Sequence, residues 1–250
     1  MITGFHSITI GVSDLTAAIS DYKTLFGLDA DASDSGAAEF TLANTRLRIQ
    51  QSDQLGVCRL TFAVDDLNAT SQFLTRLGLL EPDDSLGQTQ SLKSSNTRSL
   101  NLAISETGMS GAAVSNSEQA DRITGLDHIV IQTDYPEHTG YLLGCQLGLD
   151  LRLDRTNSDW NSRLLFFRCG DAVVEVYHPL ESQSRIHEDQ FFGITWRTSD
   201  IAATHQRLLK QGVTVSDIRK GRKIGTAVFT IKSHTAHVPT LVIGASSRAD

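Results

Sequence analysis

The stretch that decides the fold is LDHIVIQTD, residues 126–134. Side chains alternate along it, so that Ile129 and Ile131 face one way while His128 and Gln132 face the other. This period of two predicts a strand with one buried face. The stretch ends in Asp134, a residue type that caps helix N-termini. We therefore expect a strand that leads directly into a helix.

The same order of features occurs four times along the chain. Each copy has an alternating strand, an Asp, apolar residues at helical spacing, and a Gly that follows the Asp by 12 to 14 positions. The strands and their Asp residues occupy 8–14, 60–66, 129–134 and 194–200. The Asp fits a helix N-cap and the Gly a left-handed C-cap. Because shorter alternating runs follow each Gly, every copy reads as a βαβββ module.

Four tandem βαβββ modules predict an α+β fold. One module alone would expose a face of its sheet, so we expect the modules to pair into two half-barrel cups. Residues 106–124 are rich in Ser, Gly and Ala and have no periodicity, which indicates a linker. The predicted domains are therefore a module pair at 1–105 with a degenerate site, and a second pair at 125–250 that holds the candidate active cup.

Composition narrows the functional classes. The chain has 250 residues and a net charge of −7, so binding to nucleic acid is not expected. It contains no apolar run of membrane-spanning length and no signal-like N-terminus, and its three cysteines are scattered. We expect a cytoplasmic protein with a small-molecule ligand, and we leave a homodimer open. Nucleotide-loop, dinucleotide and nucleophile-elbow motifs are absent from the sequence.

The modules resemble a known superfamily. LDHIVIQTD opens module three and VVEVYHP (173–179) closes it, while GITWRTSDI (193–201) opens module four. This arrangement resembles the vicinal oxygen chelate superfamily over nearly the whole chain, and in particular its glyoxalase-like subgroup. Relatives in that superfamily include glyoxalase I, extradiol dioxygenases, bleomycin-resistance proteins and methylmalonyl-CoA epimerase. The resemblance implies a metal held by a His on a first strand and a Glu or His on a last strand, with positions left for two substrate oxygens.

Module three alone has both residues, His128 and Glu175. The position of His128 corresponds to Ser7, Arg59 and Gly193 in the other modules. The position of Glu175 corresponds to Arg48 in module one, to Asn101 or Ala103 in module two, and to Leu241 or Val242 in module four. The resemblance thus implies at most two ligands for a divalent metal (Fe, Mn, Ni or Zn). Without a metal, His128 and Glu175 can act as a catalytic acid/base pair, or simply shape the pocket through a hydrogen bond.

Six further residues are predicted to bind substrate. Arginine on a cup-facing strand is costly unless paired, which suggests an anionic ligand. Basic residues after Gly221 are suited to hold the same anion. The predicted substrate-binding residues are Gln132, Tyr177, Thr195, Arg197, Arg222 and Lys223.

Two functions follow from the sequence. The first is a glyoxalase- or dioxygenase-like enzyme, of lyase, isomerase or ring-cleaving type, acting on a small oxygenated and anionic substrate in the C-terminal cup. The second is a metal-free protein that binds and sequesters a small molecule, as the bleomycin-resistance proteins do. The His128–Glu175 pair favours the first function, and the lack of ligand residues in module four favours the second.

Overall fold

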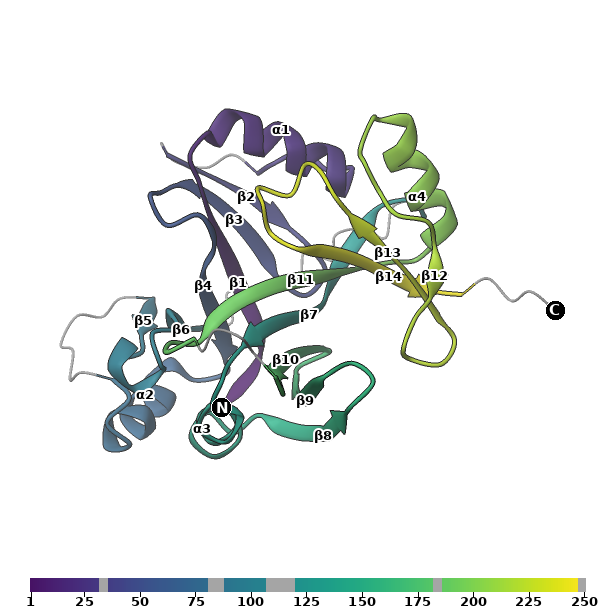
Figure 1. The fold of residues 1–250 in the computed structure, drawn as a ribbon. Coiled ribbons are helices and arrows are strands. Elements are labelled where there is room, and N and C mark those ends of the chain that lie inside the picture. Colours follow the sequence, from purple (N-terminus) through teal and green to yellow (C-terminus); the bar gives the residue numbers. More distant parts are fainter. Residues whose placement is uncertain (32–35, 81–87, 107–119, 182–185, 247–250) are drawn as a thin grey trace. The chain divides into compact units, whose positions relative to one another are not determined.

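The computed structural model describes residues 1–31, 36–80, 88–106, 120–181 and 186–246. Modules one and two form a six-stranded sheet of order β2-β3-β1-β4-β6-β5 (Figure 1). Module one supplies β1 (Ile2–Val12), α1 (Leu15–Phe26), β2 (Ala37–Thr41) and β3 (Arg46–Gln51). Module two supplies β4 (Gly56–Val64), α2 (Leu67–Arg76), β5 (Thr89–Ser91), the short 3-10 helix η1 (Ser94–Asn96) and β6 (Leu102–Glu106).

Modules three and four form an eight-stranded sheet of order β12-β13-β14-β11-β7-β10-β9-β8. Module three supplies β7 (Ile123–Gln132), α3 (Pro136–Tyr141), the π-helix η2 (Leu142–Gln146), β8 (Asp150–Asn157), β9 (Ser162–Cys169) and β10 (Ala172–Pro179). Module four supplies β11 (Gln190–Thr198), α4 (Ile201–Lys210), β12 (Arg219–Lys220), β13 (Thr226–Ile231) and β14 (Thr240–Ala245).

These two mixed sheets confirm the predicted α+β class and the modular repeat. Modules three and four are complete βαβββ units. In the described parts of modules one and two, the helix is followed by two strands instead of three. In module one, Asp31 forms only an isolated bridge to Glu39. Residues 81–87 of module two lie outside the described residues.

The predicted linker, residues 106–124, extends too far at both ends. Glu106 ends β6, and Ile123 and Thr124 begin β7, while residues 107–119 lie outside the described part of the chain. The boundaries at 105 and 125 stay a prediction. Contacts divide the chain into two compact units. Unit 1 comprises 1–8, 59–110 and 128–192, and unit 2 comprises 9–58, 111–127 and 193–250.

Three of the four predicted helix caps are confirmed. Asp14, Asp66 and Asp200 each accept a hydrogen bond from the backbone N–H three residues later. The prediction that Asp134 caps the third helix is wrong. Its carboxylate accepts a bond from Ile186 N at 2.5 Å, and α3 starts at Pro136 after Tyr135. The Gly after each helix adopts positive φ, as predicted for a left-handed helix end.

In unit 1, one face of the module-three sheet packs against α3 and η2. Ile129, Ile131, Val174 and Val176 are fully buried on this face. Glycines in the helix allow the close approach, because a Cβ added at Gly140 or Gly144 would lie 3.3 Å from Leu165 or Phe167. The opposite face of the same strands is only half-buried. The alternation predicted from the sequence is therefore confirmed for β7.

Unit 2 has an aromatic core centred on Phe26, at the end of α1. The Phe26 ring lies 5.1 Å from Trp196 of β11 and 5.5 Å from both Tyr22 and Phe40, with edge-to-face geometry in each case. All four side chains are essentially inaccessible to solvent. The first helix of the chain and the first strand of module four therefore share one hydrophobic core. No described helix is long and apolar enough to cross a membrane.

A buried carboxylate joins modules two and three in unit 1. The Asp189 side chain is fully buried and accepts hydrogen bonds from Thr133 Oγ1 at 2.7 Å, Thr139 Oγ1 at 2.5 Å and Arg98 Nε at 2.8 Å. Arg98 also donates to the His187 carbonyl oxygen and lies 4.2 Å from the centre of the Tyr135 ring. Asp189 N donates in turn to Arg98 O. We call Arg98, Thr133, Thr139 and Asp189 the Asp189 clamp.

We expect Arg98→Ala to lower the free energy of unfolding by about 3 kcal/mol, because it leaves a buried carboxylate without its counter-charge. Urea denaturation followed by circular dichroism measures this loss. Arg152→Ala is the matched control. It removes an arginine from an exposed pair with Asp150 and should cost less than about 1 kcal/mol. Equal losses in the two variants would contradict a stabilising role for the Asp189 clamp.

Candidate active site

His128 and Glu175 come together on the half-buried face of module three. β7 and β10 pair in parallel, with Ile129 opposite Val174 and Val130 opposite Glu175. This register places the two side chains diagonally on one face, with His128 Nε2 3.5 Å from Glu175 Oε2. Their side chains are 19% and 13% exposed, so both are sheltered from solvent without being sealed from it. The predicted contact between them is confirmed by this distance.

Two predicted substrate-binding residues lie on the same face. Tyr177 is opposite Gln132 in the same pairing, two positions along each strand from Glu175 and Val130. The Gln132 side-chain oxygen accepts a hydrogen bond from Gln190 at 3.2 Å. The Tyr177 ring lies 5.9 Å from the ring of Phe192. Gln132 and Tyr177 thus extend the site within unit 1, and Gln190 and Phe192 border it.

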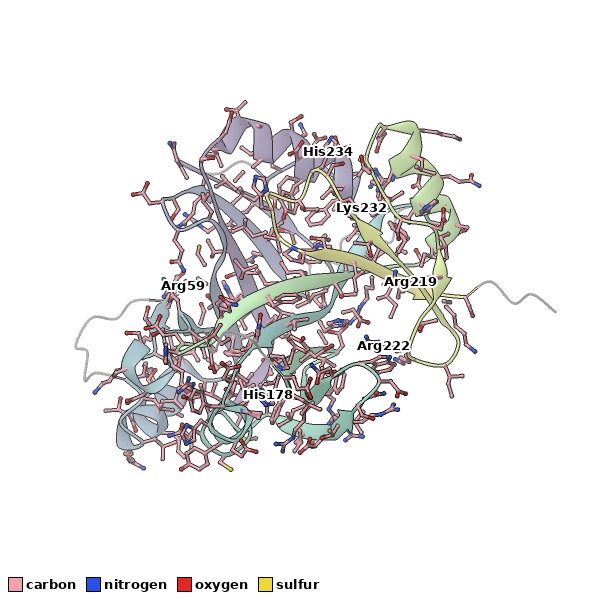
Figure 2. The ribbon with its side chains drawn as sticks, viewed as in Figure 1. Arg59, His178, Arg219, Arg222, Lys232 and His234 are labelled. Carbon is pink, nitrogen blue, oxygen red and sulfur yellow. The ribbon has the colours of Figure 1, made fainter. Side chains whose placement is uncertain are left out.

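The other four predicted substrate-binding residues belong to unit 2. Thr195 is buried on β11, and Arg197 is half-buried two residues later on the same strand. Arg222 and Lys223 are exposed in the loop between β12 and β13, where Figure 2 labels Arg222. It stays a prediction that these four residues bind the same ligand as His128 and Glu175.

Sequence reasoning missed the residues that β9 contributes. Phe166 pairs with Glu175, and Arg168 pairs with Val173, so both side chains share the face of the candidate pair. The run Leu164-Leu165-Phe166-Phe167 is apolar in both alternating sets, and the sequence therefore does not reveal which set faces the site. The antiparallel register with β10 decides it. Phe166 is half-buried there, whereas Phe167 is 1% exposed on the helix side.

The same registers identify the counterparts of Glu175 in two other modules. In module four, Thr195 pairs with Leu241, and in module two Thr61 pairs with Ala103. By analogy with Val130 and Glu175, the counterparts are Leu241 and Ala103. Neither side chain can ligate a metal or carry a proton. Of the alternatives that the sequence left open, Val242 and Asn101 are thereby eliminated.

The donor set does not fit a metal centre with three protein ligands. Within the described ranges, no three His, Cys, Asp or Glu side chains are grouped closely enough to hold an ion. Module four is also sterically closed at its first-strand position. A Cβ added at Gly193 would lie 2.7 Å from the Pro239 carbonyl oxygen, so a histidine cannot occupy this position without a backbone shift.

An ion-pair network supports the site from the helix side. Arg163 of β9 donates to both carboxylate oxygens of Asp154 on β8, at 2.9 and 2.8 Å, and to Glu137 of α3 at 2.5 Å. Hydrogen bonds from Arg163 hold the pKa of both carboxyls below their usual range, and they raise the pKa of the arginine. His178, labelled in Figure 2, has its ring nitrogen 3.0 Å from Thr133 O. This network ties α3 to the outer strands of module three.

Comparison with known proteins agrees with the fold and with the modular repeat. Residues 127–229 match the family model of the glyoxalase/bleomycin resistance protein/dioxygenase superfamily. No curated protein matches the chain in sequence. This match over modules three and four agrees with the resemblance read from the sequence, and the solved structures show the same fold.

Solved structures match all or nearly all of the four-module chain in fold. One is the Mn(II)-bound glyoxalase from Novosphingobium aromaticivorans, with 14% identity and a TM-score of 0.76 over 97% of this chain and 82% of that one. A mutant of 4-hydroxymandelate synthase from Streptomyces coelicolor has 10% identity and a TM-score of 0.77 over 100% and 94%. The 2,2',3-trihydroxybiphenyl 1,2-dioxygenase from Sphingomonas wittichii has 15% identity and a TM-score of 0.75 over 100% and 93%. Identities this low establish the fold alone.

The Arg163 network predicts a pH-dependent contribution to stability. Because the folded-state pKa values of Glu137 and Asp154 lie below the unfolded values, their contribution is present above the unfolded pKa values and is lost as pH falls through the folded ones. Arg163→Ala should therefore lower the free energy of unfolding by about 1 kcal/mol at pH 7, a value limited by solvent screening. Urea titrations at several pH values measure the difference in the free energy of unfolding between this variant and the unsubstituted protein. A gap that persisted or grew towards pH 3 would contradict this account.

Proposed function

We propose that this protein is an enzyme that moves a proton on a small oxygenated, anionic substrate, with His128 and Glu175 as its acid/base pair. The observation that carries the proposal is the 3.5 Å separation of these two groups on a half-buried face. Proton transfer needs an acid and a base within reach of the same substrate atoms, sheltered enough to be tuned but open enough to be reached. The separation and the partial burial of the pair in module three support this role.

In the proposed step, the Glu175 carboxylate takes a proton from the carbon next to a substrate carbonyl. The imidazolium of His128 donates its proton to the carbonyl oxygen, and the product is a neutral enediol or enol. Glu175 then returns its proton to the other carbon of the enediol while neutral His128 takes the proton of the hydroxyl on the first carbon, which gives isomerisation. Where the next carbon carries a leaving group, that group departs with the proton of Glu175 as His128 takes back the hydroxyl proton, which gives elimination. Tyr177, Phe166 and Phe192 provide ring surfaces beside the pair, and Arg168 provides a positive charge for the anionic group of the substrate.

The superfamily fold supports the class of this proposal, and the donor set supports its mechanism. Solved structures with this fold include a glyoxalase and 2,2',3-trihydroxybiphenyl 1,2-dioxygenase, an enzyme named for an oxygenated aromatic molecule. The two-residue donor set supports catalysis by the side chains themselves. A second candidate, a small-molecule binding protein without catalytic activity, is favoured by the closed position at Gly193.

Exchange of carbon-bound hydrogen with solvent tests the acid/base proposal without knowledge of the product. The protein is incubated in D₂O with a panel of small hydroxy acids, keto acids and hydroxyketones, and deuterium uptake is followed by NMR. We expect uptake in at least one compound, slowed about 100-fold or more by Glu175→Gln or His128→Asn, because each removes one proton carrier. His138→Asn is the control, since this histidine is exposed on α3.

The result separates the two candidate functions. Binding of a compound without deuterium uptake would support the small-molecule binding function and contradict the enzymatic one. Equal exchange rates in the Glu175→Gln variant and the unsubstituted protein would place the chemistry elsewhere. Circular dichroism of each variant confirms that a loss of exchange does not come from unfolding.

We further expect exchange to survive removal of metal ions. If His128 and Glu175 act as proton carriers, dialysis against EDTA should leave the rate within about twofold, since no step depends on a Lewis acid. Elemental analysis before and after dialysis measures the metal content of the same samples. A large loss of exchange that added Fe, Mn, Ni or Zn restored would contradict the side-chain mechanism and support a metal held by these two residues.

A further inference from the structure

A second cluster of chemistry-bearing residues lies in unit 2, in residues that the acid/base mechanism does not use. Where α1 ends, a surface pocket of about 330 Å³ is lined by Lys23, Gly27, Leu28, Asp29 and Arg122. Arg207 of α4 approaches the same end of α1, as its hydrogen bonds to Thr24 and Leu25 show. Figure 1 shows these two helices side by side. Three cations and two carboxylates, those of Asp29 and Asp121, therefore meet at this helix end.

Arg207 is fully engaged by the protein itself. Its guanidinium donates to the carbonyl oxygens of Thr24, Leu25 and Asp121 and to the side-chain oxygen of Gln211, at 2.6 to 2.9 Å. These bonds satisfy carbonyls that a helix end leaves without intrahelical partners. Burial lowers the pKa of the Arg207 guanidinium, Asp121 opposes that effect, and the neighbouring Arg122 charge lowers it further. Arg207 and Arg122 are thus close enough to repel each other.

Of the two guanidinium groups at this helix end, that of Arg122 is incompletely satisfied. Its Nε atom is buried, and no hydrogen-bond acceptor for it exists in the described part of the chain. Gly27 makes room for it, because a Cβ at that position would lie 3.3 Å from Arg122 Cγ and 3.5 Å from Arg207 Cζ. A buried donor without an acceptor, beside a second guanidinium, is costly unless a ligand supplies both an acceptor and negative charge.

Lys23 and Asp29 complete the pocket at its exposed side. Lys23 Nζ lies 2.7 Å from an Asp29 carboxylate oxygen, and the Asp29 side chain is 87% exposed. The hydrogen bond and charge of Lys23 lower the pKa of Asp29, and Arg122 adds a smaller effect. The Asp29 carboxylate therefore acts as an anion beside Lys23 and Arg122, on the solvent side of the pocket. Such an exposed carboxylate is readily displaced by a ligand that contacts both cations.

We propose that this pocket binds an oxyanion, the phosphate or carboxylate group of a small molecule, between Lys23 and Arg122. Guanidinium groups bind such anions through charge-assisted hydrogen bonds, and the ligand would relieve the repulsion between Arg122 and Arg207. The site is independent of the proposed acid/base function, since every residue in it belongs to unit 2 and His128 and Glu175 belong to unit 1.

Titration calorimetry with inorganic phosphate, and separately with malonate, tests the site at constant ionic strength set by sodium chloride. We expect saturable binding of at least one of them by the full chain, and the stronger ligand identifies the type of oxyanion. Arg122→Gln should weaken binding about tenfold or more, as expected for loss of a charge-assisted hydrogen bond. Lys232→Gln is the matched control. It removes the same charge from an exposed position of unit 2 that Figure 2 labels.

Asp29→Asn provides a test that unfolding cannot imitate. Removing the competing carboxylate should strengthen binding several-fold, because Lys23 is then available to the ligand. The proposal is overturned if neither anion binds beyond the chloride control, if Arg122→Gln binds like the unsubstituted protein, or if Asp29→Asn weakens binding. Deuterium exchange by the same variants is expected to be unchanged, so failure of this site and failure of the acid/base function are distinguishable.

Discussion

The parallel pairing of β7 with β10 is the constraint on which the candidate site depends. Ile129 lies opposite Val174 and both are buried against the helix layer, so the residues beside them must face the other way. A register shift of one residue would bury Glu175 under the helix and expose Val174. The apolar contacts that stabilise the sheet therefore also bring His128 and Glu175 together. In this site, packing and chemistry are set by the same hydrogen-bonded register.

The fold and the central pair could be predicted because they follow local rules. Alternation along 126–134 and 173–179 fixed which residues share a face, and Asp and Gly marked the ends of the helices. What the sequence could not supply were contacts decided by tertiary structure. The Asp189 clamp joins residues up to 91 positions apart, and nothing in the local sequence around Arg98 or Asp189 indicates the pairing. Asp134 has the sequence context of a cap, but a loop N–H takes its carboxylate instead.

The orientation of β9 and the cations at the end of α1 show a related limit of sequence reasoning. The run 164–167 is apolar in both alternating sets, so only the observed register assigns Phe166 to the site and Phe167 to the core. The cations at the end of α1 come from three distant segments of the chain, and each alone reads as an ordinary surface residue. Only the structure shows that they meet, because Gly27 leaves room for the side chains of Arg122 and Arg207 at the same helix end.

The four modules carry different side chains at the positions of His128 and Glu175. All four share the order of strand and helix, and they differ in the side chains of the opposite sheet face. Module two has Arg59 and Ala103 where module three has His128 and Glu175. Arg59, which is labelled in Figure 2, donates a hydrogen bond to Ser91. Module four has neither side chain. The Pro239 carbonyl fills the space that a side chain at position 193 would need, and Leu241 replaces the acid. The backbone of module four thus leaves no room for a side chain at position 193, and the proposed acid/base pair lies in module three alone.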